Sequence, residues 1–153
     1  MENVRIRPAT REDVSRVIEL YEQLTITSAC VESGRSPSLE DYWRILEGIE
    51  AMPGHHLLVV EHRGEVAGTV VFLIVPNLSH AGCPWAVMEN LIIDRRYRGL
   101  GLGRRLVEHV MTAAREAGCH KLVLTSDKRR RDAHRFYRDL GFEASAHGFR
   151  LYF

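Results

Sequence analysis

The sequence has few cysteines, no long apolar run and almost no net charge, and each shortage excludes a class of protein. Its three cysteines, Cys30, Cys83 and Cys119, are widely spaced and form no C-x-x-C pair, which argues against a disulfide framework and against a zinc site. The longest apolar run, residues 70–75, is far too short to span a bilayer, and residues 1–7 lack the apolar core of a secretion signal. We therefore expect no metal, no membrane partner and a cytoplasmic location.

The charge balance also excludes an obvious polyanionic partner. The 21 Lys and Arg residues nearly cancel the 20 Asp and Glu residues, so the net charge of +1 creates no field that would attract nucleic acid. Residues 128–131 form a local basic run, but no interleaved aromatic side chains provide platforms on which bases could stack. A solvated turn or a phosphate-binding rim is the better interpretation, and no nucleic-acid partner is expected.

The apolar periodicity predicts a single α/β domain over residues 1–153. Thr10 and Ser38 are each followed three residues later by Asp, as in a helix-capping box, and an apolar stripe at helical spacing follows each pair. In chain order we expect a strand at 4–7, helices after Thr10 and Ser38, strands at 57–62, 66–75 and 86–94, a helix at 104–117, a strand at 121–125, a helix at 132–140 and a hairpin within 142–153. These elements would form one mixed sheet of about seven strands with four helices.

A glycine-rich segment separates the predicted strand at 86–94 from the predicted helix at 104–117. At such a junction the backbone N–H groups and the helix N-terminus point at one small volume, which suits a phosphate group. Glycines let the backbone approach the anion, and flanking arginines add positive charge. The alternative is a tight turn with no ligand. The G-x-G-x-G spacing of Gly99, Gly101 and Gly103 differs from the nicotinamide-binding G-x-G-x-x-G, and no Gly-Lys-Ser or Gly-Lys-Thr of a P-loop follows.

This segment resembles the coenzyme-A pyrophosphate loop of the GNAT acetyltransferase superfamily, whose Q/R-x-x-G-x-G/A pattern is met by Arg98, Gly101 and Gly103. A second match follows at the family's spacing, because residues 132–142 resemble its A-x-x-F-Y-x-x-x-G-F segment. The resemblance covers nearly the whole chain and is weakest at residues 25–38. It implies the GNAT fold and an acetyl-CoA-dependent N-acetyltransferase.

The resemblance also implies roles for individual residues. Tyr137 would protonate the departing coenzyme-A sulfur, and Glu89 would accept the proton of the amine, directly or through water. The amine would attack the thioester directly, through a tetrahedral intermediate whose oxyanion meets backbone N–H groups of residues 91–93. The residues implied to bind the cofactor are Leu91, Ile92, Ile93, Arg98, Gly99, Leu100, Gly101, Leu102, Gly103, Arg104, His134 and Tyr137.

Both catalytic assignments have a structural alternative. Tyr137 shares an apolar helix face with Phe136 and Leu140, so packing alone could explain it. Glu89 lies in a predicted strand of mainly apolar residues, where a carboxylate is costly unless it is used or belongs to a buried ion pair.

A further resemblance indicates the chemical class of the acceptor substrate. Residues 126–137 are most similar to the small-amine branch of the superfamily, which includes aminoalkylphosphonate acetyltransferases, so a small-molecule primary amine is the expected acceptor. Two alternatives stay open: a protein or peptide N-acetyltransferase, and a non-catalytic acyl-CoA-binding regulatory domain. The family's frequent dimers and a terminal strand at a sheet edge also suggest a homodimer.

Overall fold

The structure, a computed structural model, describes residues 3–24 and 36–153. It divides into two compact units, Met1–Val123 and Leu124–Phe153, which are described separately. That the two units form the single domain expected from the sequence stays a prediction.

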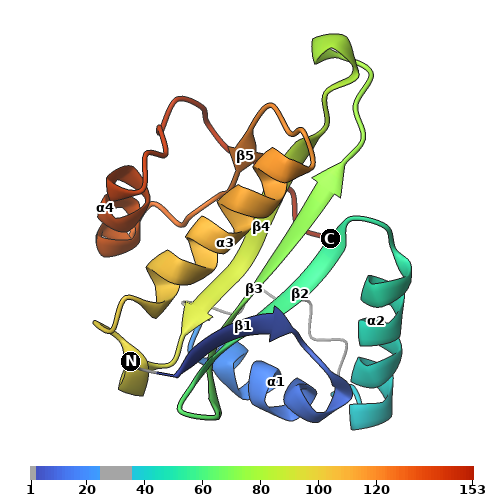
Figure 1. The fold of residues 1–153 in the computed structure, drawn as a ribbon, viewed down its shortest axis with the longest axis vertical. Coiled ribbons are helices and arrows are strands. Elements are labelled where there is room, and N and C mark those ends of the chain that lie inside the picture. Colours follow the sequence, from blue (N-terminus) through green and yellow to red (C-terminus); the bar gives the residue numbers. More distant parts are fainter. Residues whose placement is uncertain (1–2, 25–35) are drawn as a thin grey trace. The chain divides into compact units, whose positions relative to one another are not determined.

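The first unit is built on one mixed sheet with the strand order β1-β2-β3-β4-β5 (Figure 1). Pairing is antiparallel from β1 to β4 and parallel between β4 and β5. The elements of this unit are β1 (Val4–Pro8), η1 (Arg11–Asp13), α1 (Val14–Glu22), α2 (Leu39–Ala51), β2 (His55–His62), β3 (Glu65–Val75), η2 (His80–Gly82), β4 (Trp85–Ile93), η3 (Arg95–Tyr97), α3 (Leu102–Glu116) and β5 (Leu122–Val123). The predicted α/β class is confirmed.

Local chemistry explains where the first elements begin and end. The Asp13 carboxylate accepts a hydrogen bond from the Thr10 backbone N–H (2.7 Å), and the Asp41 carboxylate accepts one from Ser38 (2.8 Å), so α1 and α2 follow the predicted capping pairs. Arg63 and Gly64 both have positive φ, 52° and 83°, the geometry of a tight two-residue hairpin turn. That turn joins β2 to β3.

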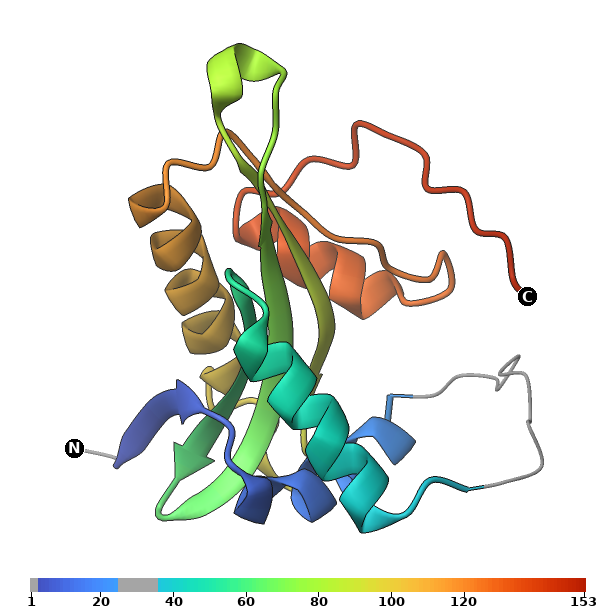
Figure 2. The same cartoon turned by 90° about the vertical axis from the view of Figure 1, so that its right-hand side faces the viewer.

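The core of the first unit lies on both faces of the sheet. Figure 2 shows α3 on one side and α1 and α2 on the other. Val59 of β2 packs with Ala9 and Val17, while Leu106 of α3 is fully buried. Gly68 of β3 permits a close approach to β4, because an added Cβ would lie only 2.4 Å from the Ile93 side chain. This crowding fixes the end of β4 from which the glycine-rich segment departs.

The second unit contains one helix, α4 (Arg131–Asp139), which matches the predicted helix and ends before Gly141, whose φ is 92°. The hairpin expected within residues 142–153 is wrong, because no strand forms in the described residues 124–153. The strand expected at 121–125 shortens to β5. The sheet of the described chain therefore has five strands, not about seven. Phe149 and Phe153 lie almost fully exposed, and a hairpin without a packed apolar face is only marginally stable.

Across the described residues, every helix is too short or too polar to cross a membrane.

Candidate functional site

Strand β4 is irregular at Glu89, one of the two predicted catalytic residues. Val71 of β3 pairs with Glu89, but Thr69 pairs with Ile92, so β4 carries one extra residue in this stretch. Asn90 has a φ of 54°, a left-handed conformation that Asn tolerates better than most residues. Such a bulge interrupts the ladder and redirects the neighbouring side chains.

The bulge leaves the Glu89 side chain exposed. A buried ion pair, the structural alternative for Glu89, does not fit this exposure. The catalytic role of Glu89 stays a prediction.

Strands β4 and β5 pair only briefly. Their ladder consists of Ala86 with Leu122 and Val87 with Val123. Beyond this point, the edge of residues 88–93 that faces β5 has no strand partner within the described chain. This is the arrangement expected of two strands that splay apart.

The glycine-rich segment begins with a bend at the end of β4. The Arg98 side chain folds back over this bend, since its Nε donates to the Ile93 carbonyl oxygen (3.2 Å). Gly99 and Gly101 have φ values of 80° and 75°, and a Cβ added at either would meet no atom within 4 Å. These glycines therefore serve the backbone shape of the loop, and the space beside them is open to a ligand.

Helix α3 starts immediately after Gly101, with Leu102 buried in the core and Gly103 in its first turn. The first N–H groups of a helix have no carbonyl partner within it, and the helix dipole places partial positive charge there. Three exposed arginines lie in the loop or in the first turn of the helix: Arg98, Arg104 and Arg105. The loop thus combines backbone donors with guanidinium groups, a suitable cradle for a pyrophosphate.

Not every predicted cofactor-binding residue offers its side chain. Ile92 and Leu102 are 3% and 1% exposed, so only their backbones could contact a ligand. Leu91 and Ile93 are half-buried, whereas Leu100 is exposed.

His134 and Tyr137 lie on α4 in the second unit. Tyr137 is half-buried and packs edge-on against Phe136 and Phe142, with ring centroids 5.2 and 5.7 Å away. His134 Nε2 lies 2.8 Å from the Asp127 carbonyl oxygen. Of the two packing partners that the structural alternative named, Phe136 contacts Tyr137, and Phe142 adds a second ring. Tyr137 lies on α4, within the predicted helix.

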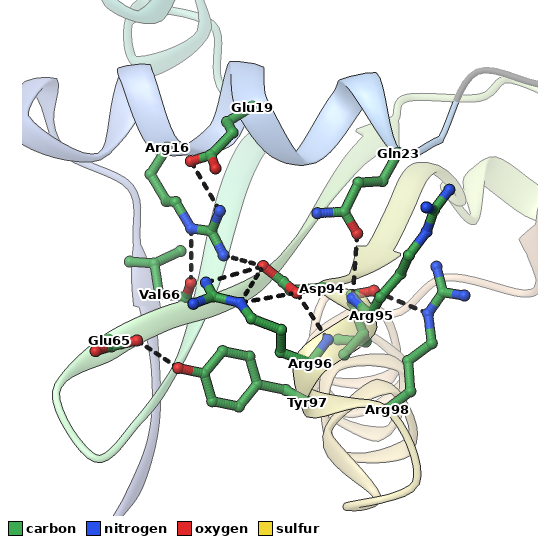
Figure 3. A network of polar contacts seen from close by, with 11 residues as sticks. Arg16, Glu19, Gln23, Glu65, Val66, Asp94, Arg95, Arg96, Tyr97 and Arg98 are labelled. Carbon is green, nitrogen blue, oxygen red and sulfur yellow. Dashed lines mark hydrogen bonds and ion pairs between the residues drawn. The ribbon is translucent and has the colours of Figure 1, made fainter.

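Sequence reasoning missed a polar network at the base of the loop (Figure 3). Its centre is Asp94, which is 2% exposed and contacts the guanidinium groups of Arg16 and Arg96. Burial would raise the pKa of Asp94, but hydrogen bonds from Arg96 and Arg16 and the charge of Arg16 hold it well below its ordinary value. The sequence signal that could have predicted this network is the position of Asp94, a carboxylate directly after the apolar residues 91–93.

Within residues 3–24 and 36–153, no three or more His, Cys, Asp and Glu side chains are grouped so as to hold a metal ion.

Residues 11–142 match the model of the acetyltransferase (GNAT) family. The chain belongs to this family. The predicted enzyme class, a GNAT acyltransferase, is confirmed by this match.

Relatives of the GNAT chain share much of its length. A glucosamine 6-phosphate N-acetyltransferase of Trypanosoma brucei brucei is 32% identical over 58% of this chain, and the match spans only 58% of that protein. An aminoalkylphosphonate N-acetyltransferase of Salmonella typhimurium strain LT2 is 31% identical over 88% of this chain and 91% of its own. The solved structure of a putative acetyltransferase from Agrobacterium tumefaciens strain C58 has a TM-score of 0.85 and 30% identity, covering 97% of this chain and 99% of that one.

Proposed function

We propose that this protein is an acetyl-CoA-dependent N-acetyltransferase whose acceptor is a small molecule with a primary amine. The observation that carries the proposal is the strand–loop–helix junction at residues 94–104, where glycines with positive φ and exposed arginines lie at a helix N-terminus. The GNAT family uses acyl-CoA, and this junction suits its pyrophosphate.

The identity of the acceptor is supported by the relatives. Glucosamine 6-phosphate and aminoalkylphosphonates differ in their scaffolds, but both join an amine to a phosphorus oxyanion. Amines of this kind are therefore the first acceptors to test.

The proposed mechanism distributes three tasks over the chain. Bound acetyl-CoA supplies an activated acetyl thioester. Glu89 accepts the proton of the attacking amine, directly or through water, and backbone N–H groups near residues 91–93 donate to the carbonyl oxygen as negative charge develops on it. Tyr137 donates a proton to the departing thiolate. Loop residues 98–104 bind the pyrophosphate, and His134 lines the cofactor site.

Calorimetry with coenzyme A tests the loop assignment. Gly101→Glu puts a negative side chain at the proposed cradle, so affinity should fall at least about tenfold. Gly118→Glu is the matched control, because Gly118 also has a φ of 75°, lacks neighbours within 4 Å of an added Cβ and lies at the other end of α3. It should bind coenzyme A as the wild type does. Unchanged affinity in a folded Gly101→Glu protein would move the site elsewhere.

An acceptor screen tests the activity. Release of free thiol from acetyl-CoA should be stimulated by aminoalkylphosphonates or amino-sugar phosphates more than by aminoglycosides, polyamines or peptides. Stimulation by peptides alone would favour a protein N-acetyltransferase. Tight binding of coenzyme A with no transfer to any amine would favour a non-catalytic acyl-CoA-binding domain.

A further inference from the structure

We propose that Asp94 is a positioning residue for the cofactor loop, and that its contact with Arg16 of α1 fixes the bend from which the loop leaves β4. This inference rests on the proposed function, because it concerns the same loop.

The Asp94 carboxylate closes the bend by its own contacts. Oδ1 accepts the Arg96 backbone N–H (2.8 Å), and Oδ2 contacts the Arg96 guanidinium (3.2 Å). The Asp94 backbone N–H donates to the Ala67 carbonyl of β3 (2.8 Å), and its own carbonyl accepts from Tyr97 (2.9 Å). Both carboxylate oxygens of Asp94 and both of its backbone polar groups therefore have hydrogen-bond partners.

Arg16 ties this bend to the rest of the first unit (Figure 3). Its Nη2 bonds Asp94 Oδ2, its Nε donates to the Val66 carbonyl of β3 (3.1 Å), and its Nη1 pairs with Glu19 (2.8 Å). A second link lies nearby, because Oε1 of Gln23, the C-cap residue of α1, accepts the Arg95 backbone N–H (3.1 Å). One helix thus holds the start of the loop at two successive residues.

The need for such an anchor follows from the loop itself. A glycine-rich backbone has many accessible conformations, and ordering it when a ligand binds costs conformational entropy. Gly99 and Gly101 carry no side chain, and a Cβ added at either would meet no atom within 4 Å, so side-chain packing does not restrict this part of the loop. Helix α3 fixes one end of the loop, and Asp94 fixes the other. If the loop is already ordered before binding, less conformational entropy is lost when the cofactor binds, and affinity is higher.

The chain contains a matched control for this idea. Asp13 is also buried, at 6% exposed, and it accepts two hydrogen bonds from the Arg7 guanidinium (2.6 and 3.0 Å) and one from a backbone N–H. It joins β1 to the start of α1 and makes none of the contacts given for the loop. Asp13→Asn and Asp94→Asn thus each weaken a buried aspartate–arginine pair, but only Asp94→Asn releases the bend.

Two acetyl donors separate positioning from general damage. S-acetyl-pantetheine carries the thioester but lacks the nucleotide diphosphate. Asp94→Asn should raise KM for acetyl-CoA about tenfold with kcat nearly unchanged, and it should leave kcat/KM for S-acetyl-pantetheine near the wild-type value. Asp13→Asn should alter neither donor by more than about twofold, in assays run below the melting temperature of every variant.

A second variant keeps the inference testable if Asp94→Asn does not fold. Arg16→Met removes the link from α1 and leaves the contacts between Asp94 and Arg96 in place, so it should shift KM for acetyl-CoA in the same direction by a smaller factor. Equal losses with both donors, or equal effects of Asp94→Asn and Asp13→Asn, would overturn the positioning role. If the wild type itself binds no coenzyme A and uses both donors equally well, the proposed loop function fails, and this inference falls with it.

Discussion

The two compact units of this chain differ in how their side chains are fixed. Among residues 3–24 and 36–153, every buried side chain belongs to Met1–Val123, and α4 in Leu124–Phe153 has none. The contacts of the second unit are half-buried or exposed: Tyr137 packs against Phe136 and Phe142, and Arg129 donates to Asp127 (2.8 Å). The glycine-rich loop thus leaves a densely packed base, whereas Tyr137 lies on a weakly packed helix. Substitutions of buried side chains, which lie in the first unit among the described residues, should therefore mainly alter stability, whereas substitutions on the weakly packed α4 should cost little stability.

The largest effect is expected at Tyr137. Tyr137→Phe removes the hydroxyl but keeps the ring against Phe136 and Phe142, so a catalytic Tyr137 should lose about 100-fold to 10,000-fold in kcat with little change in stability. Single-turnover kinetics and thermal unfolding measure the two quantities. Tyr152→Phe, an exposed tyrosine of the same unit, is the control and should retain full rate. Wild-type turnover by Tyr137→Phe, with acetyl transfer rate-limiting, would assign the residue to packing.

The next largest effect should be on stability, at Leu106 in the first unit. Its side chain is 0% exposed, so Leu106→Ala should lower the free energy of unfolding by about 2–5 kcal/mol. Leu140 follows α4 and is only half-buried, so Leu140→Ala should cost less than half as much. Urea unfolding measures both. Equal losses would mean that the second unit is packed as firmly as the first.

The same contrast explains what the sequence could predict about the fold. Capping pairs, the Arg63-Gly64 turn and the apolar stripe of α3 are local signals, and the elements they predict are present. Helix α3 begins earlier than expected, because Leu102 shares a buried face with Leu106 one turn later. The terminal hairpin is wrong because two short strands at the tail need a packed partner surface, which a pattern of residue types does not provide.

In the candidate site too, features set by local sequence could be predicted, and features set by contacts between distant residues could not. The strand–glycine–helix spacing is local, so the loop could be placed from the sequence. The exposure of Glu89 could not, because it depends on the bulge at Asn90 in the pairing of β4 with β3. The contact between Arg16 and Asp94 joins residues 78 positions apart, and only the folded chain brings them together.

A moderate effect on rate is expected at Glu89, which belongs to the first unit but is exposed. As a general base, its carboxylate must be ionised to accept a proton, so the rate should rise with pH through an apparent pKa. Glu89→Gln should remove that rise and lower the rate by about 100-fold, near the low end for a general base, because water can take over part of the role. Two amines of different basicity separate the enzyme's profile from that of the acceptor. An unchanged profile with both amines would exclude Glu89 from the mechanism.

The smallest expected effect is the response of stability to acid, which again should originate in the first unit. Burial raises the pKa of Asp13 and of Asp94, but hydrogen bonds from Arg7 to Asp13 and from Arg96 to Asp94 outweigh it, so both values lie below the ordinary 3.8. A carboxylate with a depressed pKa stabilises the fold above its unfolded pKa, and this contribution is lost as the pH falls toward its folded pKa. The free energy of unfolding should therefore decline as the pH drops below about 5.

Variants separate the sources of that decline. Asp94→Asn and Asp13→Asn should each flatten it, because an amide does not titrate. Hydrogen bonds from Arg129 also lower the pKa of Asp127, but that carboxylate belongs to the second unit and solvent screens its ion pair, so Asp127→Asn should leave the decline unchanged. Unfolding by urea at pH 7 and pH 4 measures the difference for each variant. If Asp127→Asn flattened the decline as much as Asp94→Asn, the ion pair of the second unit would stabilise the fold as much as the buried pair of the first unit.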